Sequence, residues 1–213
     1  MSAKKVLLIN YAGFVTTGNT FIADNSLATL AAVLIKNHIA VEIIDLQSPA
    51  HAESVVSHID PECSEEVFHR LTHRKEISQA TFDYYMQQRG NGLRALENNL
   101  LETLRTKIRE EDVGLIGFKL WTGNGLSGMV RVAETLRKEF PKLRLVAGGP
   151  AIRYSEGFFF NRTKAFDYLV NGDGEEALLN LAKGKDEKIP GSFKLDGERV
   201  CMNPTEFIRD LNS

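Results

Sequence analysis

The chain has 213 residues, of which 43% are hydrophobic and 25% are charged, and its formal net charge is −2. This length suits one α/β domain with a sizeable core, and the near-neutral charge excludes an electrostatic case for nucleic acid or an anionic membrane as partner. No apolar run is long enough to span a membrane, and the first residues lack a signal-peptide pattern. Two distant cysteines, Cys63 and Cys201, indicate a reducing compartment. We therefore expect a cytoplasmic protein.

Short apolar runs alternate with segments of helical periodicity. The expected strands are, in chain order, residues 5–10, 40–46, 113–120, 143–150 and 166–171. Between the first two, Leu27, Leu30, Ala31 and Leu34 recur at the spacing of one helix face. Strand, helix and strand in this order form a βαβ unit. The sequence therefore predicts a doubly wound, Rossmann-like or flavodoxin-like sheet of five parallel strands.

The region 47–112 interrupts this alternation, because it is long, polar and mostly helical in pattern. His69 and His73 share one helix face, but no acid completes a metal motif, so we expect solvated surface histidines. A turn is expected at 89–92, and an amphipathic helix over 93–109 should form the crossover to the third strand. The part at about 48–92 is then a helical insertion, either a cap beside a ligand or a surface decoration.

The carboxyl-terminal part of the sequence departs from the α/β pattern. Asp196 and Gly197 lie between short apolar runs and predict a hairpin, which a polar segment follows. We therefore expect a Rossmann-like domain over residues 1–188, and a hairpin and linker over 189–213.

Four loops rich in small residues follow expected strands. They lie at 11–25, 121–125, 148–150 and 172–174. One such loop alone is only a turn that needs a positive φ, but the carboxyl ends of parallel strands share one edge of the sheet, where ligands bind. Four glycine-rich loops at that edge therefore predict a ligand site.

Common catalytic and nucleotide-binding motifs are absent from the sequence. No G-x-G-x-x-G follows the first strand, although Asp45 would suit the acid that such a site needs, and there is no Walker lysine loop. No nucleophile is accompanied by a recognisable base and orienting acid. We therefore expect a binder of a large cofactor, with no catalytic residues and no metal ligands of its own. A cofactor-free signalling or interaction module and a flavin or nucleotide binder stay open as alternatives.

Five segments, taken together, carry a family resemblance. They are KVLLIN, SLATLAAVLIKNHIAVEIIDL, VGLIGFKLWTGNG, LRLVAGGP and FDYLVNGDGEEALLNLAKG. The sequence resembles the amino-terminal cobalamin-binding domain of cobalamin-dependent radical S-adenosylmethionine enzymes over about residues 4–47 and 113–184. The combination of GGP with the acidic GDGEEAL loop gives the resemblance most of its specificity.

The resemblance implies a base-off cobalamin held across the strand ends without a protein histidine on cobalt. The histidine motif D-x-H-x-x-G is absent, because Asn10-Tyr11-Ala12-Gly13 stands where it would begin. S-adenosylmethionine and a [4Fe–4S] cluster would bind only to a downstream radical domain, the expected partner, whose C-x-x-x-C-x-x-C motif this sequence lacks. The whole enzyme would be a methyltransferase or cyclase-like enzyme, and this chain alone would not be catalytic. The implied cofactor-binding residues are Asn10, Tyr11, Ala12, Thr16, Lys119, Trp121, Thr122, Gly123, Asn124, Gly148, Gly149, Pro150, Gly172, Asp173, Gly174 and Glu175.

Overall fold

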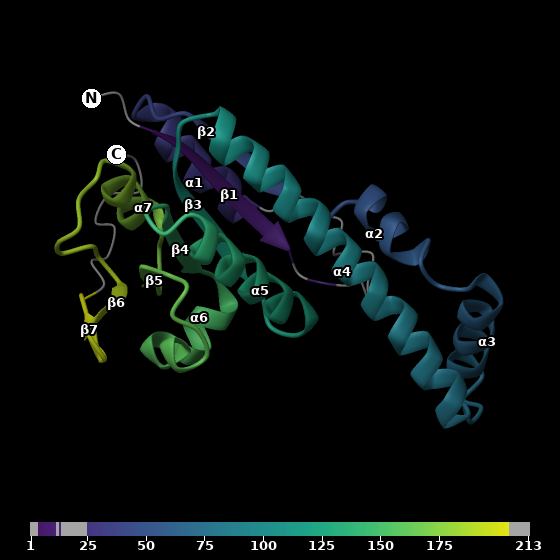
Figure 1. Cartoon of the computed structure of the whole chain (residues 1–213). Helices are drawn as coiled ribbons and strands as arrows, with labels where there is room; N and C mark the ends of the chain where they lie inside the picture. The colour runs from purple at the N-terminus through teal and green to yellow at the C-terminus, as the bar shows by residue number, and fades with distance from the viewer. Residues whose placement is uncertain (1–3, 12, 14–24, 205–213) are drawn as a thin grey trace.

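The computed structural model describes residues 4–11, 13 and 25–204. Within them, one mixed sheet lies between two layers of helices (Figure 1). The strand order is β2-β1-β3-β4-β5-β6-β7. The strands are β1 (Lys5–Tyr11), β2 (Val41–Asp45), β3 (Val113–Leu120), β4 (Arg144–Gly148), β5 (Tyr168–Val170), β6 (Ser192–Asp196) and β7 (Arg199–Met202). Strands β1 to β5 pair in parallel, so the predicted α/β class is confirmed.

The prediction of a five-stranded sheet is corrected by the carboxyl-terminal hairpin. Its strands β6 and β7 are joined by a turn that contains Gly197, whose φ of +60° suits glycine. They do not stand apart, because β6 pairs antiparallel with β5 and places Leu169 opposite Phe193. Phe193 is buried in the core, so apolar burial draws the hairpin into the same sheet. The sheet therefore has seven strands in the described part of the chain, and its last two pairings, β5 with β6 and β6 with β7, are antiparallel.

Alternation along the strands feeds two hydrophobic cores. On one face, Val6 and Leu8 of β1 pack with α1 (Asn25–Lys36) and α7 (Glu175–Ala182). On the other face, Leu7 and Ile9 share a core with Val55 and with residues of four further helices. These are α4 (Gln79–Glu110), α5 (Asn124–Glu139), α6 (Pro150–Ser155) and the 3₁₀ helix η2 (Glu156–Asn161). No helix in the described ranges is both long and apolar enough to cross a membrane.

The insertion contains α2 (Pro49–Val56), α3 (Pro61–Thr72) and the first half of α4. The predicted turn at 89–92 is wrong, because α4 runs unbroken for 32 residues. Gly92 serves a tertiary contact instead. A Cβ there would lie 2.5 Å from the carbonyl oxygen of Val55, so glycine lets α2 cross α4 closely.

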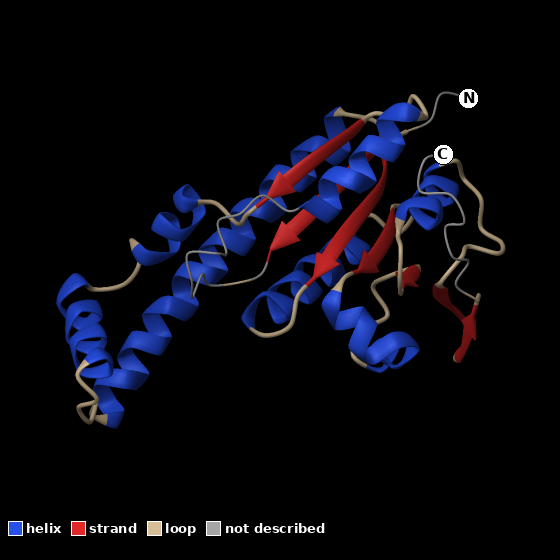
Figure 2. Ribbon diagram, turned by 180° about the vertical axis from the view of Figure 1, so that it is seen from behind, coloured by secondary structure: helices blue, strands red, loops and turns tan. Residues whose placement is uncertain are grey.

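The predicted crossover helix is confirmed in the second half of α4. Its leucine stripe packs into the core with the sheet. The buried members are Leu96, Leu100, Leu101 and Leu104. We call residues 49–91 the arm, because it extends past the carboxyl ends of β1 and β2 (Figure 2).

Ion pairs join α4 to its neighbours. Glu97 is buried, and both of its carboxylate oxygens accept from Arg131 of α5 at 2.7–3.1 Å. Gly128 leaves the room for this carboxylate, since a Cβ there would overlap it. Near the other end of α4, Lys107 pairs with Glu42 of β2 at 2.8 Å. The second half of α4 is therefore held to α5 and to the sheet by ion pairs.

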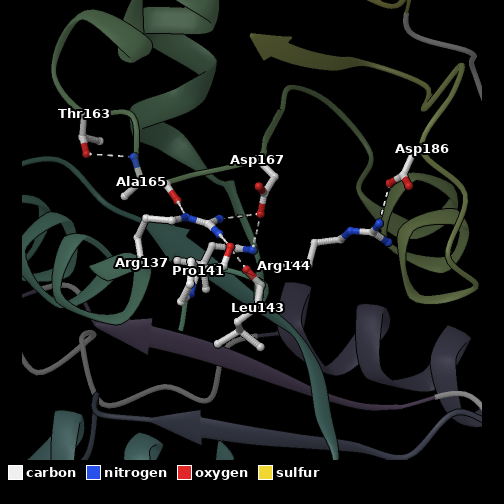
Figure 3. A network of polar contacts seen from close by, with 9 residues as sticks. Arg137, Pro141, Leu143, Arg144, Thr163, Ala165, Asp167 and Asp186 are labelled. Atoms are coloured by element: carbon white, nitrogen blue, oxygen red, sulfur yellow. Dashed lines mark hydrogen bonds and ion pairs between the residues drawn. The ribbon is translucent and has the colours of Figure 1, made fainter. Parts of the chain in front are cut away.

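The amino edge of the sheet is closed by polar contacts (Figure 3). Arg137 of α5 donates to the carboxylate of Asp167 at 2.6 Å, and the same carboxylate accepts from the backbone N–H of Leu145 at 2.8 Å. Arg137 also donates to the backbone carbonyl oxygens of Pro141, Leu143 and Ala165. Beside it, Arg144 pairs with Asp186. These contacts satisfy the charged side chains of Arg137, Asp167 and Arg144 within the chain.

Candidate functional site

A cavity of about 220 Å³ lies at the carboxyl edge of the strands, between the sheet and helices α1 and α7. Its walls are mostly apolar, and its polar side chains are few. The apolar residues include Leu8, Leu27, Leu30, Val146, Val170 and Leu178. The polar side chains are Ser26, Lys119, Asp173 and Glu175. An apolar slot with a few polar groups suits a flat organic ligand whose polar part reaches the strand ends.

The two glycines that follow β4 have different physical roles. Gly149 has a φ of +95°, and a Cβ there would lie 3.1 Å from the carbonyl oxygen of Leu120. The backbone therefore requires glycine at 149, as the turn interpretation of the sequence expected. Gly148 has no left-handed φ, and its Cβ would meet only the carbonyl oxygen of Val170 at an ordinary 3.5 Å. The fold does not require glycine at 148, so its lack of a side chain has another reason.

Gly117, inside β3, also lines the cavity, although the sequence reasoning missed it. A Cβ there would lie 2.9 Å from the Leu8 side chain. A glycine within a buried strand signals a close approach by another group, and that signal was visible in VGLIGFKL. The α1 residues Ser26, Leu27 and Leu30 were also missed. Their sequence carries only an ordinary apolar helix face, so nothing in it marks a cavity wall.

Asn10 is fully buried and acts as a connector rather than as an exposed ligand-binding group. Its amide nitrogen donates to Asp45 at 3.0 Å and to Gln47 at 2.6 Å. Its oxygen accepts from the indole nitrogen of Trp121 at 2.8 Å. These contacts hold Trp121 at the end of β3. The acid that would suit a nucleotide-binding site, Asp45, is therefore used within the chain.

Lys119 brings β3, α1 and the tryptophan together at the cavity. Its ammonium group donates to the hydroxyl of Ser26 at 2.9 Å and lies 4.6 Å from the centre of the Trp121 ring. Lys119 also lines a neighbouring hollow of about 630 Å³, which reaches Pro150 and Arg153. The two hollows share Lys119, so one ligand could contact both through a single cationic group.

The other predicted site residues divide into two sets. Gly172, Asp173, Gly174 and Glu175 line the cavity together with Gly148 and Gly149. The exposed residues Thr122, Gly123 and Asn124 line neither hollow. Gly13 nevertheless lies close to the start of α5, since a Cβ at Gly13 would lie 2.5 Å from the backbone nitrogen of Gly125. Ala12 and Thr16 lie outside the described residues.

Tyr11 points away from the cavity, into the core beside Glu97 and Arg131. Its hydroxyl is buried and has no hydrogen-bond partner among the described residues. Burial, with the Glu97 carboxylate as a smaller cause, raises the pKa of Tyr11. Tyr11 is therefore a neutral core residue here, and its predicted contact with a cofactor stays a prediction.

The histidines lie away from the cavity. His69 and His73 share one face of α3, as the spacing predicted, with ring centres 4.2 Å apart and both residues exposed. Among the described residues, no group of three or more His, Cys, Asp or Glu side chains could hold a metal ion.

Residues 83–182 match the family model described as the B12 binding domain. The match contains β3, β4, β5 and the glycine loops that follow them. It confirms the resemblance to a cobalamin-binding domain that the sequence motifs predicted.

Two curated relatives are methyltransferases. The 2-(S-pantetheinyl)-carbapenam-3-carboxylate methyltransferase of Streptantibioticus cattleyicolor is 29% identical over 115 residues, which are 51% of this chain and 16% of that protein. The cobalamin-dependent radical SAM methyltransferase TokK of Streptomyces tokunonensis is 31% identical over 74 residues, which are 35% of this chain and 10% of that protein. The matches therefore span about a sixth and a tenth of the relatives' lengths.

One solved structure, an ABC sugar transporter subunit from Rhodobacter sphaeroides, covers 95% of this chain and 99% of its own, with 9% identity and a TM-score of 0.24. A likeness at this level carries no inference about the fold or the site.

Proposed function

We propose that this chain binds cobalamin in the base-off form, with the nucleotide tail in the 220 Å³ cavity and with no protein histidine on cobalt. The observation that carries the proposal is the position of this cavity, at the glycine-rich ends of the strands that match the B12 binding domain. Both curated relatives are methyltransferases, and one is described as cobalamin-dependent.

The residues of the cavity fit the parts of such a cofactor. The apolar walls suit the flat base, and Gly148 leaves space that a side chain would fill. At the strand ends, Lys119 offers a positive charge near the path of the phosphodiester, and Trp121 offers an aromatic surface beside the corrin. When bound, the corrinoid supplies a cobalt centre for methyl transfer, while this chain binds and orients it.

The histidine-free mode is supported by where the histidines lie. His38 follows α1, and the other four belong to α2, to α3 or to the residues just after them. None of the five lines either hollow at the strand ends. The whole enzyme is then a radical methyltransferase or cyclase-like enzyme, in which residues 189–213 lead to a downstream domain that binds S-adenosylmethionine and a [4Fe–4S] cluster.

Titration of the purified chain with hydroxocobalamin, followed by its visible spectrum, tests the proposal. We expect saturable binding with a base-off spectrum. After reduction to cob(II)alamin, electron paramagnetic resonance should show no nitrogen splitting from a protein histidine. Such splitting would refute the histidine-free mode, and no binding of cobalamin together with binding of a flavin would refute the proposal as a whole.

A further inference from the structure

Glu175 has an unusual position at the cavity. It is the first residue of α7 and one of the residues that line the cavity. Its Oε2 atom is buried, and no hydrogen-bond partner for it exists among the described residues. The neighbouring Glu176 carries the same carboxylate but is exposed and lines neither hollow.

An unpartnered buried carboxylate oxygen lowers the stability of the free protein, because the oxygen has lost water without gaining a donor. The amino terminus of α7 favours the negative charge, and no side chain caps this helix end. These features keep an acceptor ready beside an apolar slot, although nothing in the described chain uses it. Such an acceptor suits a hydrogen-bond donor that a bound ligand brings.

We infer that Glu175 accepts a hydrogen bond from a neutral hydroxyl or amide N–H in the nucleotide part of the ligand. This inference rests on the proposed function. A carboxylate can only accept hydrogen bonds, so a neutral donor satisfies it, whereas a phosphate or a second carboxylate is repelled. Lys119 lines the same cavity and attracts an anionic group. Glu175 thus selects the neutral part of the tail, while Lys119 attracts its phosphodiester.

The test compares two corrinoids and two variants. Hydroxocobalamin carries the nucleotide tail, and dicyanocobinamide lacks it. Glu175→Leu removes the acceptor at nearly constant volume, and Glu176→Leu makes the same charge change at the adjacent exposed position. We expect Glu175→Leu to weaken the binding of hydroxocobalamin about tenfold or more, to leave the affinity for dicyanocobinamide unchanged, and to keep or raise the melting temperature of the free protein. Glu176→Leu should change none of the three.

The other outcomes separate the two claims. If wild-type protein binds hydroxocobalamin and Glu175→Leu binds it equally well, the role of Glu175 is refuted and the proposed function stands. The same holds if Glu175→Leu lowers the melting temperature or weakens both corrinoids equally, since Glu175 is then a structural residue. If the wild-type protein binds no cobalamin, the proposed function fails and this inference fails with it.

Discussion

We call the carboxyl edge of the strands, with the loops at 121–125, 148–150 and 172–174, the glycine edge. The helices of the arm and those of the glycine edge begin in opposite ways. In the arm, the side chains of Ser48, Asp60 and Ser78 each accept from a backbone N–H in the first turn of α2, α3 and α4. At the edge, the N-cap residues of α5 and α7 are Gly123 and Gly174, which offer no side-chain cap. The arm thus satisfies its helix ends internally, whereas the edge leaves N–H groups for water or a ligand.

The two regions also differ in where their apolar side chains lie. The edge collects apolar side chains around an open slot. In the arm, α3 has a single buried residue, Val67, while Phe68 and Leu71 are 69% and 61% exposed. The edge is therefore built around a space for a small molecule, and the arm carries apolar surface outward. The connection between β2 and β3 therefore supplies both a core helix, the second half of α4, and a separate outer surface, the arm.

The largest expected effect comes from the paired glycines at the edge. Gly148→Val should abolish cobalamin binding, by more than about a hundredfold, and leave the fold intact, because its Cβ has room but its branches enter the cavity. Gly149→Val should instead lower the free energy of unfolding by about 2 kcal/mol or more, since valine resists a φ of +95°. Circular dichroism reports whether each variant is folded, urea unfolding measures the free energy of unfolding, and corrinoid titration measures the affinity for cobalamin. A folded Gly148→Val that binds with normal affinity would place the ligand elsewhere.

A smaller effect is expected from shortening the arm. The backbone nitrogen of Asp60 donates to the side chain of Gln88 at 2.6 Å, so these two positions are close enough for a short link. Replacing residues 61–87 by a short Gly-Ser bridge keeps α2 and its contact at Gly92. We expect a folded protein whose cobalamin affinity falls several-fold, because the predicted cap over the corrin is lost. A Gly-Ser insertion of similar length after Gly184 is the matched control, and unchanged affinity would make the arm a surface for another partner.

The smallest effect concerns pH and the anchor of α4. Hydrogen bonds from Lys107 and Lys5 lower the pKa of Glu42 below its ordinary 4.5. The pKa of Glu42 is lower in the folded state than in the unfolded state. Its ion pairs with Lys107 and Lys5 therefore stabilise the fold above about pH 4.5, and this contribution is lost as the pH falls through the folded-state pKa. Urea unfolding of wild type and Glu42→Gln between pH 7 and pH 3 should show a weaker acid dependence in the variant. Identical slopes would show that the pair adds nothing measurable.

The five parallel strands could be predicted from the sequence because each is a local apolar run, whereas the pairing of the carboxyl-terminal hairpin with β5 could not. The structural roles of the glycines could not all be predicted from the local sequence. Gly92 suggested a turn, but it serves a contact with α2, which lies far from it in the sequence. Gly148 and Gly149 are the same residue in adjacent positions, yet only backbone geometry separates a required glycine from a permitted one. The partner of Asn10, Trp121, is 111 residues away, and no local pattern encodes such a distance.

The unbroken course of α4 has a mechanical consequence. At 1.5 Å per residue its 32 residues span about 48 Å, and roughly half of that length lies beyond the part that packs on the sheet. A rod without a joint transmits rotation, so a tilt of about 5° at its base moves the tip by about 2 Å. The base is held by the pair of Glu97 and Arg131, which also contacts the α5 that starts at the glycine edge. A force on the tip of the arm would therefore act on this ion pair and on α5, on the face of the sheet opposite the 220 Å³ cavity.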